Sequence, residues 1–275
     1  MVKRPAGAIR VGIGGWTFEP WRGTFYPKGL PQKQELAYAS SHLTAIEING
    51  TYYGSQKPES FARWRDETPD GFMFAVKGPR FTTNRRVLAE AEASIERFVT
   101  GGVTELKDKL GPINWQFLPT KSFDPADFEA FLKLLPTEAD GLALRHVVEV
   151  RHPSFRVPEF VALLRTYGVA TVLTDKEEFP HIPDVTAPFV YARLQQASEA
   201  CETGYAPAEL QHWAERGGTF AAGGCPKDLD YVVPPPRKGA APRDVFVFMI
   251  NGHKPKAPAA AMALIERLGA KSDAP

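Results

Sequence analysis

Cysteine is scarce in this sequence, and neither sign of charge dominates it. The 275 residues include only two cysteines, Cys201 and Cys225, so disulfides do not frame the fold, and two unpaired thiols in a reducing compartment are expected. Lysine and arginine number 33 against 32 aspartates and glutamates, which gives a formal net charge of +1. This balance argues against a general nucleic-acid coat protein and against an acidic tail, while a local basic patch stays compatible with it.

Long apolar runs are missing as well. No stretch approaches the roughly 20 apolar residues of a membrane-spanning helix, and the basic residues 1–7 are not followed by the apolar segment of a signal peptide. We therefore expect a cytoplasmic protein that does not interact with a membrane. Hydrophobic residues still make up 43% of the chain, which is ordinary for a globular protein. Its length suits one large domain, and α/β barrels are commonly of about this size.

Several motifs of cofactor binding and catalysis are also absent. Gly12, Gly14 and Gly15 do not complete a Gly-x-Gly-x-x-Gly dinucleotide motif, because Thr17 occupies the position of the third glycine. The chain has no His-Glu-x-x-His segment of the kind that binds zinc, and nothing in its order of residues supports a Ser-His-Asp or Cys-His arrangement. The sequence therefore predicts no Rossmann-type dinucleotide site and no cofactor, apart from the divalent metal considered below.

What the sequence does contain is a regular alternation of strand and helix patterns. Eight short apolar runs bounded by turn residues are typical of buried strands, at residues 9–13, 45–48, 72–77, 113–118, 146–153, 169–173, 189–194 and 245–250. Helical patterns occur at residues 33–42, 58–67, 124–135, 158–167 and 259–268. Because strands that alternate with helices form parallel βαβ units, eight strands predict an α/β fold, a single-domain (β/α)8 TIM barrel over residues 1–275.

Two connections interrupt the alternation. Residues 176–188 contain three prolines and no helical period, so the unit after the sixth strand is expected to lack a full helix. Residues 217–242 are rich in glycine and proline, which predicts an inserted loop before the last strand, either a lid or an excursion without secondary structure.

The strand at residues 146–153 has the most unusual composition. Three ionisable residues, Glu149, Arg151 and His152, gather at its carboxyl end. Ionisable groups in a buried parallel strand are costly unless they meet a partner or a ligand. One interpretation is a structural ion pair between Glu149 and Arg151 with a solvated histidine; the favoured one is a set of site residues.

Polar residues end or follow most of the other predicted strands. Active sites of TIM barrels lie at the carboxyl ends of the strands, so these side chains are expected to surround one opening. The set comprises Glu47, Asn49, Lys77, Asn114, Gln116, Glu149, Arg151, His152, Asp175, Tyr191, Arg193, Asn251 and His253. Trp16, Trp21, Tyr52 and Tyr53 could add an aromatic wall for a sugar or a base, although such rings more often belong to the core.

The charges in this set suggest an anionic ligand. Lys77, Arg151 and Arg193 would bring positive charge to the opening, and arginine binds carboxylate or phosphate through two parallel hydrogen bonds. The alternative is that each cation pairs with a carboxylate and only holds the rim of the barrel. Carboxylates in different environments could serve as general acid and general base.

The order of these motifs resembles that of the DUF72 family, also called YecE-like. The resemblance rests on residues 9–12, Gly15-Trp16, residues 21–27, 47–53, Trp64, residues 74–77, 116–119 and 149–153, and it covers nearly all of the chain except residues 217–242. It implies a TIM barrel and candidate site positions but no reaction. Members often carry a segment like Asn-Asn-Asp after the last strand, whereas this chain has Asn251-Gly252-His253.

The leading hypothesis is an enzyme that acts on a small anionic, sugar-like substrate, phosphorylated or carboxylated, by acid/base chemistry. Glu149 would be the main acid or base with Asp175 as its partner, and His152 and His253 would move protons. Substrate binding is assigned to Lys77, Arg151, Arg193, Asn49, Tyr52, Gln116, Tyr191, Asn251 and Trp16.

Two other hypotheses remain open. The first is a phosphodiesterase or nuclease assisted by a divalent metal, for which Glu149, Asp175, His152 and His253 are suitable ligand types; nearby cations make a metal less favoured. The second is a barrel without enzymatic activity that binds nucleic acid through the basic residues 80–86, which is not favoured because Arg85 and Arg86 fit a solvated helix face.

Overall fold

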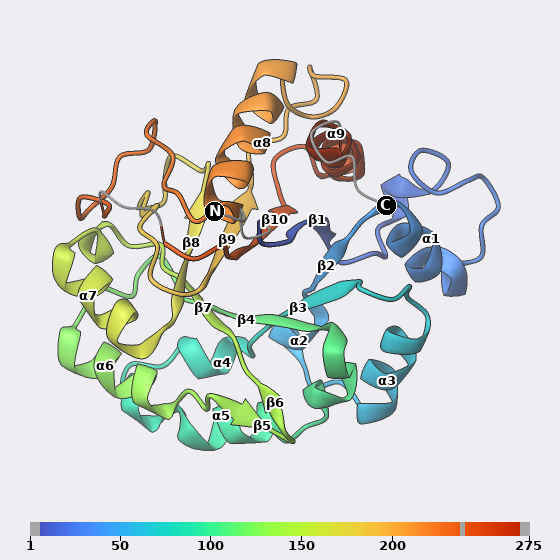
Figure 1. The fold of residues 1–275 in the computed structure, drawn as a ribbon. Coiled ribbons are helices and arrows are strands. Elements are labelled where there is room, and N and C mark those ends of the chain that lie inside the picture. Colours follow the sequence, from blue (N-terminus) through green and yellow to red (C-terminus); the bar gives the residue numbers. More distant parts are fainter. Residues whose placement is uncertain (1–5, 237–239, 270–275) are drawn as a thin grey trace.

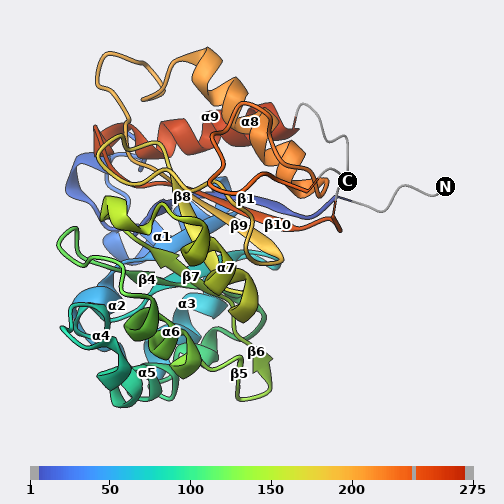
Figure 2. The ribbon, with the colours of Figure 1, turned by 90° about the vertical axis from the view of Figure 1, so that its left-hand side faces the viewer.

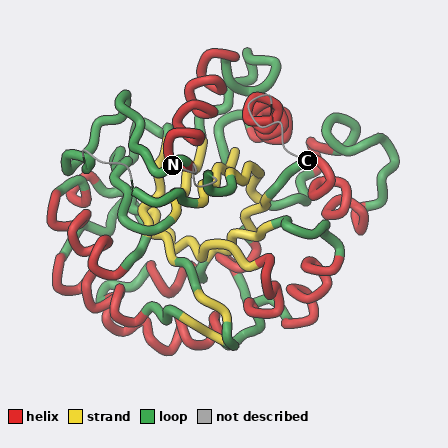
Figure 3. Tube along the Cα trace, viewed as in Figure 1, coloured by secondary structure: helices red, strands yellow, loops and turns green. Residues whose placement is uncertain are grey.

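Eight parallel strands close into a barrel, and helices surround it (Figures 1 and 3). The structure, a computed structural model, describes residues 6–236 and 240–269. Around the barrel the strands follow the order β1-β10-β9-β8-β7-β4-β3-β2, and β2 pairs with β1 to complete the ring. The strands are β1 (Ile9–Gly14), β2 (Ala45–Ile48), β3 (Met73–Lys77), β4 (Leu110–Gln116), β7 (His146–Glu149), β8 (Ala170–Thr174), β9 (Phe189–Leu194) and β10 (Asp244–Met249). The predicted (β/α)8 barrel is confirmed.

Helices cover the outside of the ring. They are α1 (Glu35–His42), α2 (Gly50–Tyr53), α3 (Pro58–Asp66), α4 (Arg80–Thr83), α5 (Glu92–Val99), α6 (Pro125–Leu134), α7 (Pro158–Tyr167), α8 (Pro207–Ala221) and α9 (Ala257–Gly269). A two-stranded hairpin of β5 (Glu138–Ala139) and β6 (Leu142–Ala143) lies outside the barrel. In both ribbon views α8 and α9 lie side by side, and they pack on β1 and β10 (Figures 1 and 2). Among the helices of residues 6–236 and 240–269, none combines the length and apolarity needed to cross a membrane.

Local sequence explains where several helices begin and end. The carboxylate of Asp124 accepts hydrogen bonds from the backbone N–H groups of Ala126 and Asp127 at 3.0 and 3.2 Å, which caps α6, and proline occupies its first position. Helix α7 ends at Tyr167 because Gly168 adopts the left-handed conformation, with φ of 64°. Both ends agree with the sequence pattern.

The ring closes through a close approach of β1 and β2. A Cβ atom on Gly12 would lie 1.8 Å from the carbonyl oxygen of Ala45, so only glycine allows the two strands to pair at this point. The pairing brings Gly14 opposite Glu47 and completes the barrel.

The interior of the barrel changes from apolar to charged along the strands. Apolar side chains such as Phe189 and Phe246 fill it toward the amino ends of β9 and β10, and Tyr191 follows them. The next inward position on β9 is Arg193, which is 2% exposed. A separate and larger apolar core lies between the strands and the surrounding helices. Charge is therefore concentrated inside the barrel toward the carboxyl ends of its strands.

The connections differ in part from the prediction. The described residues 175–188 contain no helix, as expected. The loop predicted at 217–242 begins later, because α8 continues through Gly217 and Gly218 to Ala221. The buried face of α8, with Leu210, Trp213 and Phe220, outweighs the low helix propensity of two glycines. Residues 237–239 of the predicted loop lie outside the described part of the chain.

Candidate active site

A buried ion-pair cluster lies inside the barrel at the carboxyl ends of β2, β7 and β9. The guanidinium of Arg193 donates from Nη2 to Glu47 Oε1 at 3.0 Å and from Nη1 to Glu149 Oε2. All three side chains are at most 3% exposed. Arg151 approaches the other oxygen of Glu149, with Nη2 at 2.7 Å and Nε at 3.1 Å. The predicted ion pair between Glu149 and Arg151 is therefore present, and it is part of a larger buried cluster.

Two neutral side chains also donate hydrogen bonds to the carboxylates. The hydroxyl of Tyr191 donates to Glu47 Oε2 at 2.6 Å. The amide nitrogen of Asn114 lies 3.4 Å from a Glu47 oxygen and 3.5 Å from a Glu149 oxygen. Two buried polar atoms of the cluster, Nε of Arg193 and Oδ1 of Asn114, have no hydrogen-bond partner among the described residues. An unpaired donor and an unpaired acceptor inside the barrel are costly unless water or a ligand reaches them.

Lys77 lies beside this cluster at the end of β3 and is 6% exposed. Its ammonium donates to the side-chain oxygen of Gln116 and lies 4.3 Å from the centre of the Tyr52 ring. The amide nitrogen of Gln116 donates in turn to the Tyr52 hydroxyl at 3.3 Å. In the described part of the chain, no carboxylate oxygen forms an ion pair with Lys77. Burial, and then the nearby positive charge of Arg193, lowers the pKa of Lys77 from 10.5 to about 8.

The cluster carries an excess of positive charge. Two carboxylates, Glu47 and Glu149, face three cations, Lys77, Arg151 and Arg193, which leaves a net charge of +1 while Lys77 is protonated. Burial alone would raise the pKa of Glu149, but the positive charges of Arg193, Arg151 and Lys77 outweigh it and lower the pKa to about 2. Glu149 is therefore ionised at neutral pH and is unsuited to donate a proton as a general acid.

Asp175 occupies a different place from the one predicted. Its carboxylate accepts hydrogen bonds from the backbone N–H of Gln195 at 2.6 Å and from the hydroxyl of Tyr205 at 2.7 Å. It lines a cavity of about 530 Å³ between the segment after β8 and helix α8. Burial raises the pKa of Asp175, and these hydrogen bonds oppose the shift. Within the described residues no hydrogen bond links Asp175 to Glu149, so the prediction that the two act as a pair is not supported.

The alternation of side chains along a strand explains this correction. Ala170 and Val172 face the interior of the barrel, and Thr174 continues their row with a hydrogen bond from Gln195. The next residue, Asp175, therefore turns outward toward α8.

The two histidines and Asn251 do not join the cluster either. Nδ1 of His152 accepts the backbone N–H of Ser154 at 3.3 Å and lies 2.8 Å from its hydroxyl oxygen, so this ring caps the 3-10 turn Pro153–Phe155. His253 is half-buried, with Nδ1 3.9 Å from Glu199, and Asn251 is exposed. No metal-binding group of three or more His, Cys, Asp or Glu side chains occurs in residues 6–236 and 240–269.

The remaining predicted residues, Trp16 and Asn49, line a cavity of about 330 Å³ at the ends of β1 and β2. Gln56 and Lys254 also line it and were not predicted. Lys254 lies five residues after β10, and its place near a strand end was the only signal for it in the sequence.

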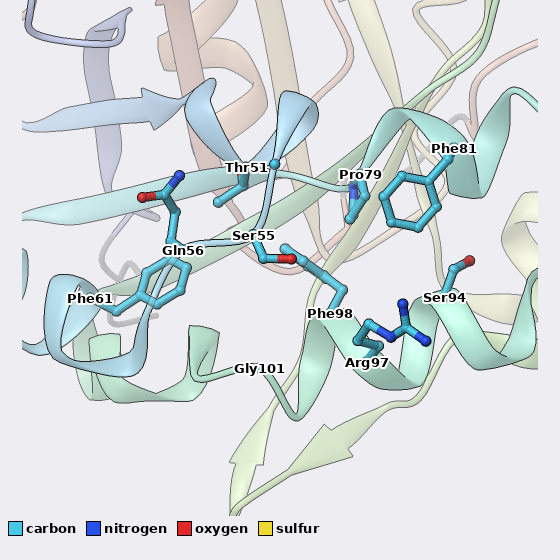
Figure 4. Close-up of a pocket in the computed structure, with 11 residues that line it drawn as sticks. Thr51, Ser55, Gln56, Phe61, Pro79, Phe81, Ser94, Arg97, Phe98 and Gly101 are labelled. Atoms are coloured by element: carbon cyan, nitrogen blue, oxygen red, sulfur yellow. The ribbon is translucent and has the colours of Figure 1, made fainter.

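A smaller hollow lies outside the barrel beside the same segments. Figure 4 shows Thr51 and Pro79 on one side and Arg97 and Phe98 of α5 on the other. Its volume of about 30 Å³ has room for little more than one water molecule. The hydroxyl of Thr51 donates to the backbone oxygen of Lys77 at 2.7 Å, so this region supports the end of β3.

A closed ring of eight parallel strands with ionised side chains at their carboxyl ends defines a TIM-barrel protein with a candidate active site at the usual position. The chain belongs to the DUF72 family, whose model, described as "Protein of unknown function DUF72", matches residues 10–275.

Individual relatives agree with this assignment. UPF0759 protein YecE of Escherichia coli K12 is 31% identical over 150 residues, which are 54% of this chain and 50% of YecE. UPF0759 protein YunF of Bacillus subtilis 168 is 35% identical over 69 residues, or 25% of this chain and 23% of YunF. The alignments thus span about half or less of these curated relatives.

Solved structures show the same fold over the whole length. The DUF72 family protein TM1631 of Thermotoga maritima MSB8 superposes with a TM-score of 0.71 at 24% identity, covering 96% of this chain and all of that one. The DUF72 family protein EF0366 of Enterococcus faecalis V583 superposes with a TM-score of 0.66 at 18% identity, covering 96% and 98%.

Proposed function

We propose that this protein is an enzyme that acts on a small anionic substrate by acid/base chemistry, and that Lys77 is the group that gains and loses the proton. The single observation that carries the proposal is the environment of Lys77. Its ammonium is buried at the end of a barrel strand beside two arginines, it has an amide oxygen and an aromatic ring as partners, and its pKa is lowered to about 8.

A pKa near neutrality suits proton transfer. A general base works best when its pKa is close to the working pH, because it is then available in the unprotonated form and still binds a proton well. Glu149, with a pKa of about 2, is a much weaker base and is already paired with two arginines. Lys77 therefore replaces Glu149 as the proposed acid/base group. Glu149 and Glu47 become positioning residues that hold Arg193 and Arg151 in place.

The charge of the cluster favours an anionic substrate. Arg193 and Arg151 are each engaged by a carboxylate, so the positive charge that is left over belongs to Lys77. While Lys77 is protonated, this excess attracts an anionic substrate to the mouth of the barrel, and Lys77 then releases its proton to solvent before it acts as a base. In the proposed reaction the neutral amine of Lys77 takes a proton from a carbon next to a carbonyl or carboxylate group. The ammonium that forms then stabilises the negative charge left on the substrate.

Hydrogen exchange in D2O tests this proposal and does not require the product to be identified. The protein is incubated with phosphorylated and carboxylated sugars, and loss of carbon-bound protons is followed by 1H NMR. We expect exchange with at least one compound, and at least a hundredfold loss of the exchange rate in Lys77→Met. Lys121→Met is the matched control, because Lys121 follows a neighbouring strand but is paired with Asp127 at 2.8 Å. An absence of exchange with every compound, or equal exchange in Lys77→Met, would rule the proposal out.

The setting of the reaction is proposed to be the cytoplasm. The two thiols, of Cys201 and Cys225, are both half-buried and are not joined to each other in the described structure, which fits a reducing compartment.

A further inference from the structure

The cavity at the ends of β1 and β2 is independent of the ion pairs but lies next to them. We call it the indole cavity; its volume is about 330 Å³, and Trp16, Asn49, Gln56 and Lys254 bring polar groups to its lining. This size lies at the lower end of the range for small-molecule sites. Since no lining residue belongs to the buried cluster, the indole cavity is a distinct place for a ligand.

Strand pairing places the indole cavity directly beyond one end of the cluster. Gly14, which lines the cavity, pairs with Glu47, the carboxylate that Arg193 contacts. A Cβ atom on Gly14 would lie 2.8 Å from the amide nitrogen of Asn49, so the Asn49 side chain extends across the end of β1. The absence of a side chain at Gly14 leaves room for the Asn49 amide and for Ile250 at this point. A molecule in the indole cavity would therefore border the mouth of the barrel.

The polar side chains that line the indole cavity have no hydrogen-bond or ion-pair partner in the described chain. Within the described chain, the side chains of Trp16, Asn49, Gln56 and Lys254 make no hydrogen bond and no ion pair, although the backbone oxygens of Trp16 and Lys254 accept bonds from Tyr26 and Trp21. Two side-chain amides, an indole N–H and an ammonium thus belong to residues that line one cavity, and none of them has a hydrogen-bond partner in the described chain. Such a convergence of free polar groups beside an aromatic wall is what a site for a hydroxylated ring requires.

Lys254 adds a charge to this arrangement. Its ammonium lies 4.5 Å from the centre of the Phe18 ring and 5.5 Å from that of Trp21, which hold the side chain in position. Partial burial also lowers its pKa. In the described residues the ammonium contacts these rings but has no anionic partner. An anion in the cavity that reached it would gain a charge-assisted hydrogen bond.

We propose that the indole cavity binds the ring of a sugar that carries an anionic group. The ring packs against the indole of Trp16, its hydroxyls exchange hydrogen bonds with the amides of Asn49 and Gln56, and the anionic group, a phosphate or a carboxylate, contacts Lys254. This inference rests on the proposed function, since it assigns the substrate of Lys77 to the class of sugar phosphates or sugar acids. The anionic group marks the end of the molecule that is remote from Lys77.

Isothermal titration calorimetry with four probes tests the inference: glucose 6-phosphate, glucuronate, glucose and inorganic phosphate. We expect glucose 6-phosphate or glucuronate to bind at least tenfold more tightly than glucose and than phosphate alone, because only they offer a ring and an anion together. Whether the phosphate or the carboxylate is preferred identifies the anionic group. Equal binding of the anionic sugars and of phosphate alone, or no binding of either anionic sugar, would overturn the inference.

Variants locate the binding. Lys254→Met keeps an unbranched side chain of similar length and removes the charge, so binding of the anionic sugar is expected to weaken tenfold or more. Lys256→Met is the control, because it removes the same charge from the same 3-10 turn, Lys254–Lys256, without lining the cavity. Gln56→Ala is expected to weaken the same probe. Circular dichroism confirms that each variant is folded.

Failure of this inference is distinguishable from failure of the proposed function. Binding that Lys254→Met leaves unchanged would overturn the sugar subsite, while exchange in D2O that depends on Lys77 would still support the acid/base role. Conversely, binding lost in Lys254→Met together with exchange retained in Lys77→Met would support the indole cavity as a sugar site and remove Lys77 as the acid/base group.

Discussion

Replacement of Arg193 with methionine should destabilise the barrel strongly. The guanidinium bridges two buried carboxylates, those of Glu47 and Glu149, and methionine would leave both without their shared cation. Removal of one member of a buried ion pair costs about 3–5 kcal/mol when it leaves a buried charge without a partner. In the described chain Glu47 would lose its ion-pair partner, whereas Glu149 would keep Arg151. For a domain of this size the midpoint of thermal unfolding should fall by roughly 6–20 °C. Thermal denaturation followed by circular dichroism at pH 7.5 measures the effect.

The dependence of this effect on pH follows from the pKa of Glu149. In the wild type it is lowered from 4.5 to about 2, so the stabilisation by its ion pairs is complete above pH 4.5 and is lost as the pH falls toward 2. The difference in stability between wild type and Arg193→Met should therefore shrink below about pH 4.5. Lys133→Met is the control, because Lys133 pairs with Glu129 on the surface, where ion pairs contribute little. A midpoint lowered by less than about 3 °C, or a difference that persists unchanged at pH 3.5, would show that the ion pairs do not stabilise the fold as argued.

Three further changes test individual parts of the structure. Between pH 4.5 and 2 the wild type should lose on the order of 3 kcal/mol of unfolding free energy, and Glu149→Gln should lose much less. An equally large loss in urea titrations of the variant would contradict the assigned pKa. Lys109 Nζ donates to backbone oxygens of Arg65 and Thr68 at the end of α3. Lys109→Met should therefore lower the free energy of unfolding by about 1–3 kcal/mol without changing exchange in D2O. Altered exchange at wild-type stability would contradict this structural role. Gly12→Ala should cost about 3 kcal/mol or more in urea denaturation, whereas Gly54→Ala, which meets open space, should not; equal stability of the two variants would contradict the tight β1–β2 contact.

The strands and the barrel were predictable because their signals are local. Each strand is a short apolar run closed by turn residues, and the predicted bounds of two of them, β2 and β9, agree with the structure. Helix α8 was not predicted, since paired glycines mask a helix that tertiary packing stabilises. Helix α5 was also missed, although its buried Ile95 and Val99 lie four residues apart as in an amphipathic helix.

The candidate site was predictable as a list of residues but not as a set of pairs. The strand-end rule selected Lys77, Glu149 and Arg193, and the structure brings all three together. Which carboxylate meets which cation depends on ring closure, since Arg193 and Glu47 are 146 positions apart in the sequence. Likewise, one residue of displacement along a strand decides whether a side chain faces inward, and this excludes Asp175 from the cluster.

The titration of Lys77 is the most direct test of the acid/base role. Its side-chain signals can be assigned in 13C NMR spectra by comparison with Lys77→Met and then followed as a function of pH. Burial beside Arg193 without a carboxylate partner predicts a midpoint of about 8. A midpoint near the ordinary value of 10.5 would show that Lys77 is a normally solvated or paired lysine, and the proposed chemistry would then lack its central group.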